Sequence, residues 1–412
     1  MKLERNEQGF HHIGLLLLLI VIAVISFVGW RVFQNHNDKQ APSTILSNNH
    51  SSQDKALEAG KSLSSNYCKG SGDGKFTHLP MNAADFSILI PYGLTVGGHV
   101  TPIDHQYFQP TVFNSPKDKY PVYAMADALI TGIEVHPPEN GNNGRIRLVF
   151  SVSCTFFYYY DLVTSVEPGI DQAHLPIQVK AGQVIGHIGG QTLDFAVWNT
   201  NKPLKGFINP ASYDGEAWKI YTADPFPYYT SELRQIVEAK DPRTATPIAG
   251  KIDYDIDGKL IGNWFEKGSG GYSGSNQAHD PNYFKTHLSF APDVYDPAHF
   301  RISIGSLYDK VQNQSDMQHV SQANAPDPKD VGVDTGMVKY DLVGWNYIKS
   351  DGTQWDEMGP AKGVTLRSNE SRFYGCAVAQ LMSAGELKFE VYSSKHCSNV
   401  SSFDSGAKTY TR

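Results

Sequence analysis

The chain has 412 residues, a formal net charge of −7 and an aromatic content of 12%. A mildly negative charge over this length argues against a nucleic-acid-binding protein and creates no strong field for any other charged partner. The length leaves room for two to three domains.

The longest apolar run of the chain is residues 13–30, which contains no charged residue. As a helix this run would be about 27 Å long, close to the hydrocarbon thickness of a bilayer. It is longer than the core of a signal peptide, and no small-residue cleavage site follows it. Gly9-Phe10 resembles a type IV prepilin leader, but Gly14 stands where that leader has glutamate. We therefore predict a retained single-pass membrane anchor in residues 1–33, with the soluble part outside the cytoplasm.

Two polar stretches divide the rest of the chain. Residues 34–61 are rich in Asn, Ser, Gln and Lys, which predicts a disordered stalk. Residues 313–332 have a similar composition and are a second linker candidate. The predicted soluble units are a β domain in 62–240, a second β unit in 246–311 and a C-terminal β unit in 333–412.

The soluble part has mostly strand patterns. Polar and apolar residues alternate in 145–152 and 193–198, and Pro and Gly recur at short intervals. The best helix candidate there is Ser231–Ala239, with Ser231 as a possible cap. Short, closely spaced strands predict a mostly β, antiparallel fold of the sandwich or barrel type.

The chain has four cysteines, which allow three pairings. Their positions favour Cys68 with Cys154 and Cys376 with Cys397, since each pair falls within one predicted unit. Two disulfides fit an oxidising compartment, and the alternative is that the thiols are free and buried.

Residues 91–199 contain a series of short motifs in a defined order. They are Gly98-His99-Val100-Thr101-Pro102-Ile103-Asp104-His105, Pro121-Val122-Tyr123-Ala124, Tyr159-Tyr160-Asp161-Leu162, Val179-Lys180-Ala181-Gly182-Gln183-Val184-Ile185-Gly186 and Leu193-Asp194-Phe195. This order resembles the lysostaphin-like zinc metallopeptidases, which cleave peptide cross-bridges of bacterial cell walls. The resemblance implies their small antiparallel β fold, the duplicated hybrid motif.

The resemblance also implies a set of site residues. His99, Asp104 and Asp194 would hold zinc or another divalent metal, and Asp161 with His105 would handle the proton. The family has histidine where Asp161 and Asp194 stand, and it spaces its first His and Asp by four residues instead of five. A more anionic site is less selective for zinc, and an ionised Asp161 cannot donate a hydrogen bond to an oxyanion. We therefore expect hydrolysis of peptidoglycan peptides to be impaired or absent.

A non-catalytic glycan- or peptide-binding or structural envelope module is the alternative. The 22 tyrosines include three in a row at 158–160, whose side chains would alternate between the faces of a strand. Each acidic site residue could instead be a solvated strand residue, and each histidine could cap a turn. Two segments also resemble half-motifs of lipoyl and biotinyl carriers, but residues 124–128 lack the required lysine.

The C-terminal third contains strand patterns without an assigned chemistry. Residues 250–265 predict a strand, an Asp257-Gly258 turn and a second strand. Asp253, Asp255 and Asp257 resemble the start of a calcium loop, but Trp264 stands where its glutamate is required, which favours the hairpin. Further strands are predicted at 287–292, 300–305, 340–347 and 387–392.

Overall fold

The computed structural model describes residues 52–137, 144–274, 282–310, 314–322 and 325–412. The predicted membrane anchor (1–33) and the first part of the predicted stalk (34–51) lie outside the described residues. Within the described ranges, the helices are all too short or too polar to span a bilayer.

The end of the predicted stalk is helical and not disordered. Helix α2 (Ser52–Leu63) buries Ala56 and Gly60. A Cβ atom on Gly60 would lie 1.6 Å from the carbonyl oxygen of Cys154, so only glycine allows this close approach. The packing of α2 on the first domain therefore orders a segment whose composition alone predicts a coil.

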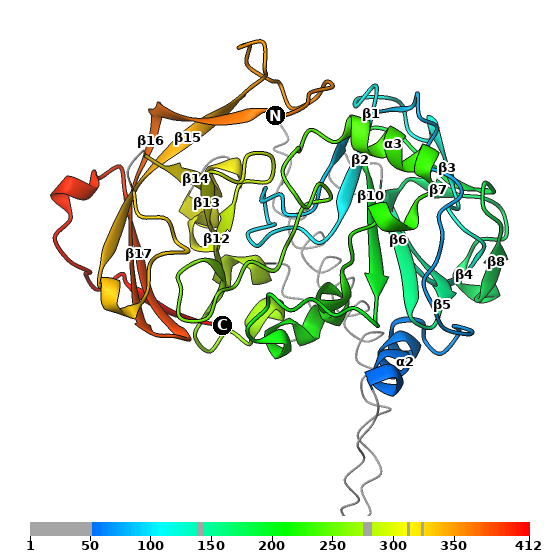
Figure 1. Cartoon of the computed structure of the whole chain (residues 1–412), viewed down its shortest axis with the longest axis horizontal. Helices are drawn as coiled ribbons and strands as arrows, with labels where there is room; N and C mark the ends of the chain where they lie inside the picture. Colours follow the sequence, from blue (N-terminus) through cyan, green and yellow to red (C-terminus); the bar gives the residue numbers. More distant parts are fainter. Residues whose placement is uncertain (1–51, 138–143, 275–281, 311–313, 323–324) are drawn as a thin grey trace, which may run out of the picture.

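The N-terminal half contains a seven-stranded sheet and a three-stranded sheet (Figure 1). The large sheet has the order β1-β2-β10-β6-β5-β4-β8, with antiparallel pairing throughout. Its strands are β1 (Phe86–Ile90), β2 (Gln106–Pro110), β4 (Ala128–His136), β5 (Arg145–Ser153), β6 (Phe156–Val163), β8 (Ile177–Val179) and β10 (Leu193–Asn199). The small sheet contains β3 (Tyr120–Tyr123), β7 (Ser165–Val166) and β9 (Val184–Ile188). The mostly β, antiparallel character predicted from the alternating segments is confirmed.

The C-terminal half is a closed barrel of eight strands. They are β11 (Gly262–Glu266), β12 (His287–Pro292), β13 (Phe300–Ile304), β14 (Gln318–Ser321), β15 (Val338–Ile348), β16 (Thr365–Ser383), β17 (Glu386–Ser393) and β18 (Lys408–Thr411). Strand β14 lies inside the predicted linker 313–332 and pairs with both β13 and β15, so this part of the segment belongs to the barrel. Neither the strands of the predicted unit 246–311 nor those of 333–412 close a sheet alone. Together they form one barrel.

The predicted hairpin at 250–265 is only half present. The turn at Asp257-Gly258 and the second strand, β11, are there, but residues 251–256 form no strand. Asp253 instead accepts a hydrogen bond from the backbone N–H of Gly206 at 2.7 Å. The Asp255 carboxylate accepts one from Ile208 at 3.1 Å. These acidic side chains fix an irregular segment between the two halves of the molecule.

The helices of the described part are short. Helix α3 (Ser231–Lys240) matches the predicted helix, but its capping side chain is Thr230 and not Ser231. The 3₁₀ segments are η2 (Gln172–His174), η3 (Pro210–Tyr221), η4 (Phe226–Tyr228), η5 (Gly271–Ser273), η6 (Tyr283–Thr286), η7 (Gly305–Lys310), η8 (Gln314–Met317), η9 (Val333–Thr335) and η10 (Cys397–Asn399). The predicted disulfides Cys68–Cys154 and Cys376–Cys397 are both confirmed.

The two halves share a buried contact. Ile88 of β1 packs in one apolar cluster with barrel residues such as Val294, Tyr347 and Trp355. A buried guanidinium, that of Arg301 on β13, also donates a hydrogen bond to the backbone carbonyl of Thr95. The barrel is thus fixed against the loop that leads into β2, which carries several of the site residues.

His319 on β14 makes the barrel sensitive to acid. Its side chain is fully buried against the Tyr374 ring, and neither ring nitrogen has a hydrogen-bond partner among the described residues. Burial lowers the pKa of His319 to about 3. The unfolded chain, with a histidine pKa of about 6.5, takes up a proton on acidification that the folded chain does not, so stability falls as the pH drops below about 6.5.

We expect a His319→Leu variant to lose part of this acid sensitivity. Between pH 7.5 and pH 5, its free energy of unfolding should fall by about 2 kcal/mol less than that of the parent chain. Urea unfolding at the two pH values measures this difference independently of any packing cost of leucine. His174→Leu, at an exposed position, is the matched control and should behave like the parent; an identical acid loss in the His319 variant would contradict the prediction.

Candidate functional site

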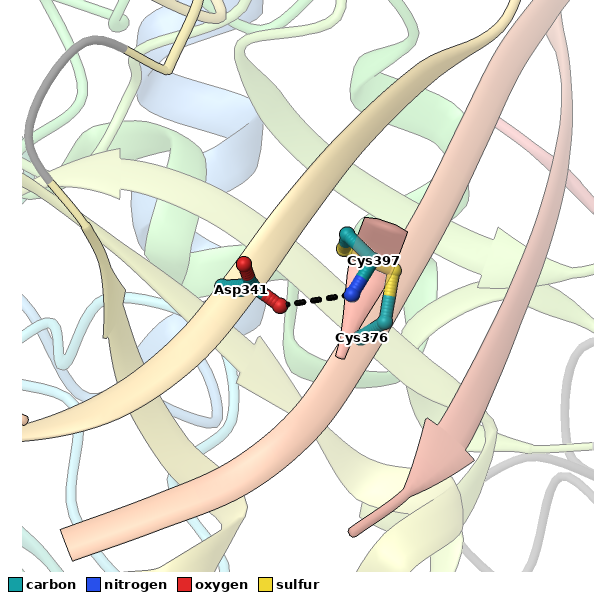
Figure 2. Close-up of side chains that lie close together, drawn as sticks. All are labelled: Asp341, Cys376 and Cys397. Atoms are coloured by element: carbon teal, nitrogen blue, oxygen red, sulfur yellow. Dashed lines mark hydrogen bonds between the residues drawn. A yellow bond between two sulfur atoms is a disulfide. The ribbon is translucent and has the colours of Figure 1, made fainter. Parts of the chain in front are cut away.

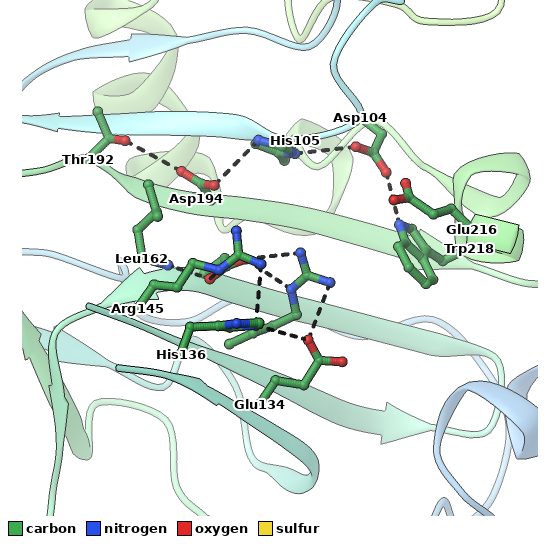
Figure 3. A network of polar contacts seen from close by, with 12 residues as sticks. Asp104, His105, Glu134, His136, Arg145, Leu162, Thr192, Asp194, Glu216 and Trp218 are labelled. Atoms are coloured by element: carbon green, nitrogen blue, oxygen red, sulfur yellow. Dashed lines mark hydrogen bonds and ion pairs between the residues drawn. The ribbon is translucent and has the colours of Figure 1, made fainter. Parts of the chain in front are cut away.

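Three neighbouring strands bring the predicted site residues together. Asp194 on β10 is the direct cross-strand partner of Asp161 on β6, so both carboxylates lie on the same face of the sheet. On its other side Asp194 pairs with Tyr107 of β2. Asp104 and His105 directly precede β2, which places them beside Asp194 (Figure 3).

His105 lies between the two carboxylates that were predicted to bind metal. Its Nδ1 is 3.3 Å from Asp104 Oδ1, and its Nε2 is 3.4 Å from Asp194 Oδ2 (Figure 3). The hydroxyl of Tyr107 is also 3.1 Å from Nε2. The rings of His99 and His105 meet edge to face, with centroids 5.6 Å apart. The imidazole of His105 therefore separates Asp104 from Asp194.

Asp104 forms an ion pair with a buried lysine that the sequence analysis did not identify. Lys219 Nζ is 3.0 Å from Asp104 Oδ1 and 3.0 Å from the carboxylate of Glu216. The second oxygen, Asp104 Oδ2, accepts a hydrogen bond of 3.0 Å from the indole N–H of Trp218. Burial alone would raise the pKa of Asp104, but Lys219 and His105 outweigh it and hold this pKa well below its ordinary value. Both oxygens of Asp104 are thus occupied by protein donors.

Asp161 forms an ion pair with an arginine. Arg147 on β5 donates to Asp161 Oδ2 from Nε at 3.0 Å and from Nη2 at 2.9 Å. The backbone N–H of Leu162 donates to Oδ1 at 2.7 Å, and Arg145 lies 3.8 Å away. Burial raises the pKa of Asp161, but the two arginines more than compensate and lower it overall. At neutral pH this group is a fixed carboxylate and not a proton donor.

Of the two remaining residues, His99 is neutral and Asp194 is only partly ionised at neutral pH. Burial, helped by the nearby charge of Lys219, lowers the pKa of His99 to about 3. Burial, together with the charge of Asp161, raises the pKa of Asp194 to about 7. Asp194 therefore carries less than a full charge at neutral pH.

The arrangement does not fit a zinc ion. Zinc needs its protein donor atoms within about 2.0–2.2 Å of one point. Among the described residues, one set of three possible ligands has its donor atoms within 4.8 Å of one another, and it is Asp341, Cys376 and Cys397 (Figure 2). Its two sulfurs form a disulfide and cannot act as thiolate ligands. His99, Asp104 and Asp194 are grouped around His105, not around one shared point.

The residues missed by sequence reasoning are Arg147, Glu216, Trp218 and Lys219. Arg147 lies in a strand whose alternation was recognised, but its partner is on the next strand. The other three belong to η3, outside the segment that carries the family motifs. Their sequence, Glu-Ala-Trp-Lys, has no recognisable signal, because only the fold brings η3 back over Asp104.

Comparisons with known proteins point to one class of solved structures. No family model and no curated protein matches the chain. Among solved structures, a zinc-containing peptidase from Vibrio cholerae is 21% identical and matches 32% of this chain and 38% of its own, with a TM-score of 0.24. Helicobacter pylori Csd3 is 17% identical and matches 32% of each chain, with a TM-score of 0.22. Lysostaphin from Staphylococcus simulans is 12% identical over 82% of this chain and 92% of its own, with a TM-score of 0.24.

The chain resembles lysostaphin-like zinc peptidases. These structures are of the same kind as the family that the sequence motifs resemble. The chain spans 38% of the length of the Vibrio cholerae peptidase, and the TM-scores are low. What the site can do is therefore inferred from the residues of this chain.

Proposed function

We propose that the chain is an envelope protein that binds peptide or glycan segments of the bacterial cell wall without cutting them and without a metal. One observation carries the proposal: Asp104 and Asp161 are each paired with a protein cation, Lys219 and Arg147. A carboxylate held in this way is not free to bind a Lewis-acid metal or to exchange protons near neutral pH. The family resemblance supplies the ligand class, since lysostaphin-like proteins act on cell-wall peptides.

The proposal includes the membrane anchor in residues 1–33, with the described part outside the cytoplasm. Two disulfides are in keeping with such a compartment. An anchored protein would meet the cell wall at a fixed distance from the membrane, which suits a binding role.

Arg145 is an exposed cation beside the buried Asp161 carboxylate. The side chain of Arg145 is 42% exposed, and its nearest acidic partner, Asp161, is 3.8 Å away. Arg147 lies over the Tyr159 ring at 5.5 Å, and Trp218 packs against a further tryptophan, Trp198. The exposed guanidinium of Arg145 suits a peptide carboxylate, and the partly exposed ring of Trp218 suits the face of a sugar ring.

Cosedimentation with purified cell-wall sacculi tests this function. The bound fraction should be the same with and without EDTA, and no soluble peptide should be released. Arg145→Ala should weaken binding about tenfold, the loss of one charge-assisted hydrogen bond. Lys180→Ala, which removes an exposed lysine paired with Asp127, should leave binding unchanged. Peptide release that EDTA stops would establish a hydrolase instead, and absence of binding would refute the proposal.

A further inference from the structure

We propose that Lys219 takes the place of a divalent cation, and that its ammonium keeps this site free of metal. Without it, Asp104 and Glu216 would form a cation site. This inference rests on the metal-independent function proposed above and goes beyond it. It names the residue responsible and adds a ligand, Glu216, that the family motifs do not contain.

Lys219 Nζ touches one oxygen of Asp104 and one of Glu216, each at 3.0 Å, so the two carboxylates already converge on one positive charge. His105 Nδ1 lies 3.3 Å from the same Asp104 oxygen. The ring of Tyr272 closes a further side of the ammonium at 4.6 Å. Two carboxylate oxygens on one positive charge, with an imidazole nitrogen beside one of them, are donor types that zinc or manganese accepts.

The side chain of Lys219 is only 6% exposed, and that of Asp104 is 5% exposed. Removing the ammonium would leave a buried carboxylate beside a second one, which is unfavourable because neither charge is compensated. A divalent cation would restore the balance and could be held more tightly than a single ammonium. In that case the site would lack metal because of Lys219. The replacement of two family histidines by Asp161 and Asp194 would not be the cause.

Truncating the lysine leaves the volume of its side chain, which is room for an ion and water. Glu216 is the one ligand with freedom to adjust, since its side chain is 27% exposed. It also stands at a kink in η3, where its φ and ψ of −135° and 60° are not helical. Its carboxylate can therefore close on a smaller, more highly charged partner.

The test is the metal content of the full chain carrying Lys219→Ala. After dialysis against zinc and then metal-free buffer, the variant should retain about one ion per chain, while the parent retains less than about 0.1. Zinc should also raise the melting temperature of the variant and leave that of the parent unchanged. Lys219→Ala/Glu216→Gln should lose the gain. Lys251→Ala, which removes a lysine from the carboxylate of Asp253, should show none.

Every other result for the Lys219→Ala variant either supports the inference or overturns it. A folded Lys219→Ala variant without bound metal would overturn the inference. A variant that folds only with zinc present would support it, because the ion then replaces the ammonium. A variant that stays unfolded with zinc present would contradict it, since the ion is proposed to be an equivalent partner. None of these results alters the sacculus binding of the parent chain, so the two proposals fail separately.

Discussion

Asp104→Ala is expected to destabilise the protein by about 3–5 kcal/mol, the usual cost of removing one member of a buried ion pair. The change leaves the Lys219 ammonium 6% exposed, with Glu216 as its remaining acidic partner. It also removes the acceptor for the indole N–H of Trp218. Urea unfolding at neutral pH measures the loss. Asp127→Ala, which breaks an exposed pair with Lys180, is the matched control and should have almost no effect.

A double variant separates the ion pair from the rest of the site. Asp104→Leu/Lys219→Met replaces both charges by apolar groups. It should be much more stable than Asp104→Ala, because the charge that then lacks a partner is that of the partly exposed Glu216. If the double variant is no more stable than the single one, Lys219 is not the partner whose charge stabilises Asp104.

The pH dependence of the stability provides a further check. The pKa of Asp104 is lowered by folding, so its contribution is present above a pH of about 4 and is lost only in stronger acid.

Arg301→Met is expected to have a comparable effect on the barrel, about 3–5 kcal/mol. Arg301 Nε donates to Asp293 Oδ2 at 2.7 Å, and Asp293 is fully buried. The guanidinium stacks on the ring of Trp345 at 3.9 Å and also bonds to the hydroxyl of Tyr347. Removing it leaves the Asp293 carboxylate without a cation and breaks the hydrogen bond to Thr95 in the other half of the molecule.

Two comparisons check this expectation. Arg301→Met/Asp293→Asn removes both charges and should recover a large part of the lost stability. Arg234→Met, at a helix position paired with Glu238 and 48% exposed, should cost less than about 1 kcal/mol. Equal losses for Arg301→Met and Arg234→Met would mean that the buried network does not hold the barrel in place.

Local patterns predicted the strands and the disulfides well. Alternation at 145–152 and 193–198 marked β5 and β10, although β10 proves to be buried on both faces. The cysteine pairs were found because each pair falls in one folded unit. The barrel was not predictable in the same way, because β14 is four residues long and its neighbours in the sequence are polar. Its strand character comes from pairing with β13 and β15, which no local pattern records.

The candidate site was predicted in part. The motif order marked Asp104, His105, Asp161 and Asp194. The fold brings Asp161 and Asp194 to adjacent strands and places Asp104 and His105 directly before the neighbouring strand β2. The partners that determine their chemistry come from elsewhere, Arg147 from the next strand and Lys219 from η3. A sequence motif shows which acidic groups replace histidines, but it does not show where the compensating positive charges lie. The roles assigned to these residues in metal binding and catalysis therefore stay predictions.

The most direct measurement of the central claim is a crystal structure of the protein grown with zinc, with anomalous diffraction recorded at the zinc edge. We predict no anomalous peak near Asp104, with the Lys219 Nζ to Asp104 Oδ1 distance close to the 3.0 Å found in the present structure. A zinc peak bound by His99, Asp104 and Asp194, with Lys219 displaced, would contradict the account.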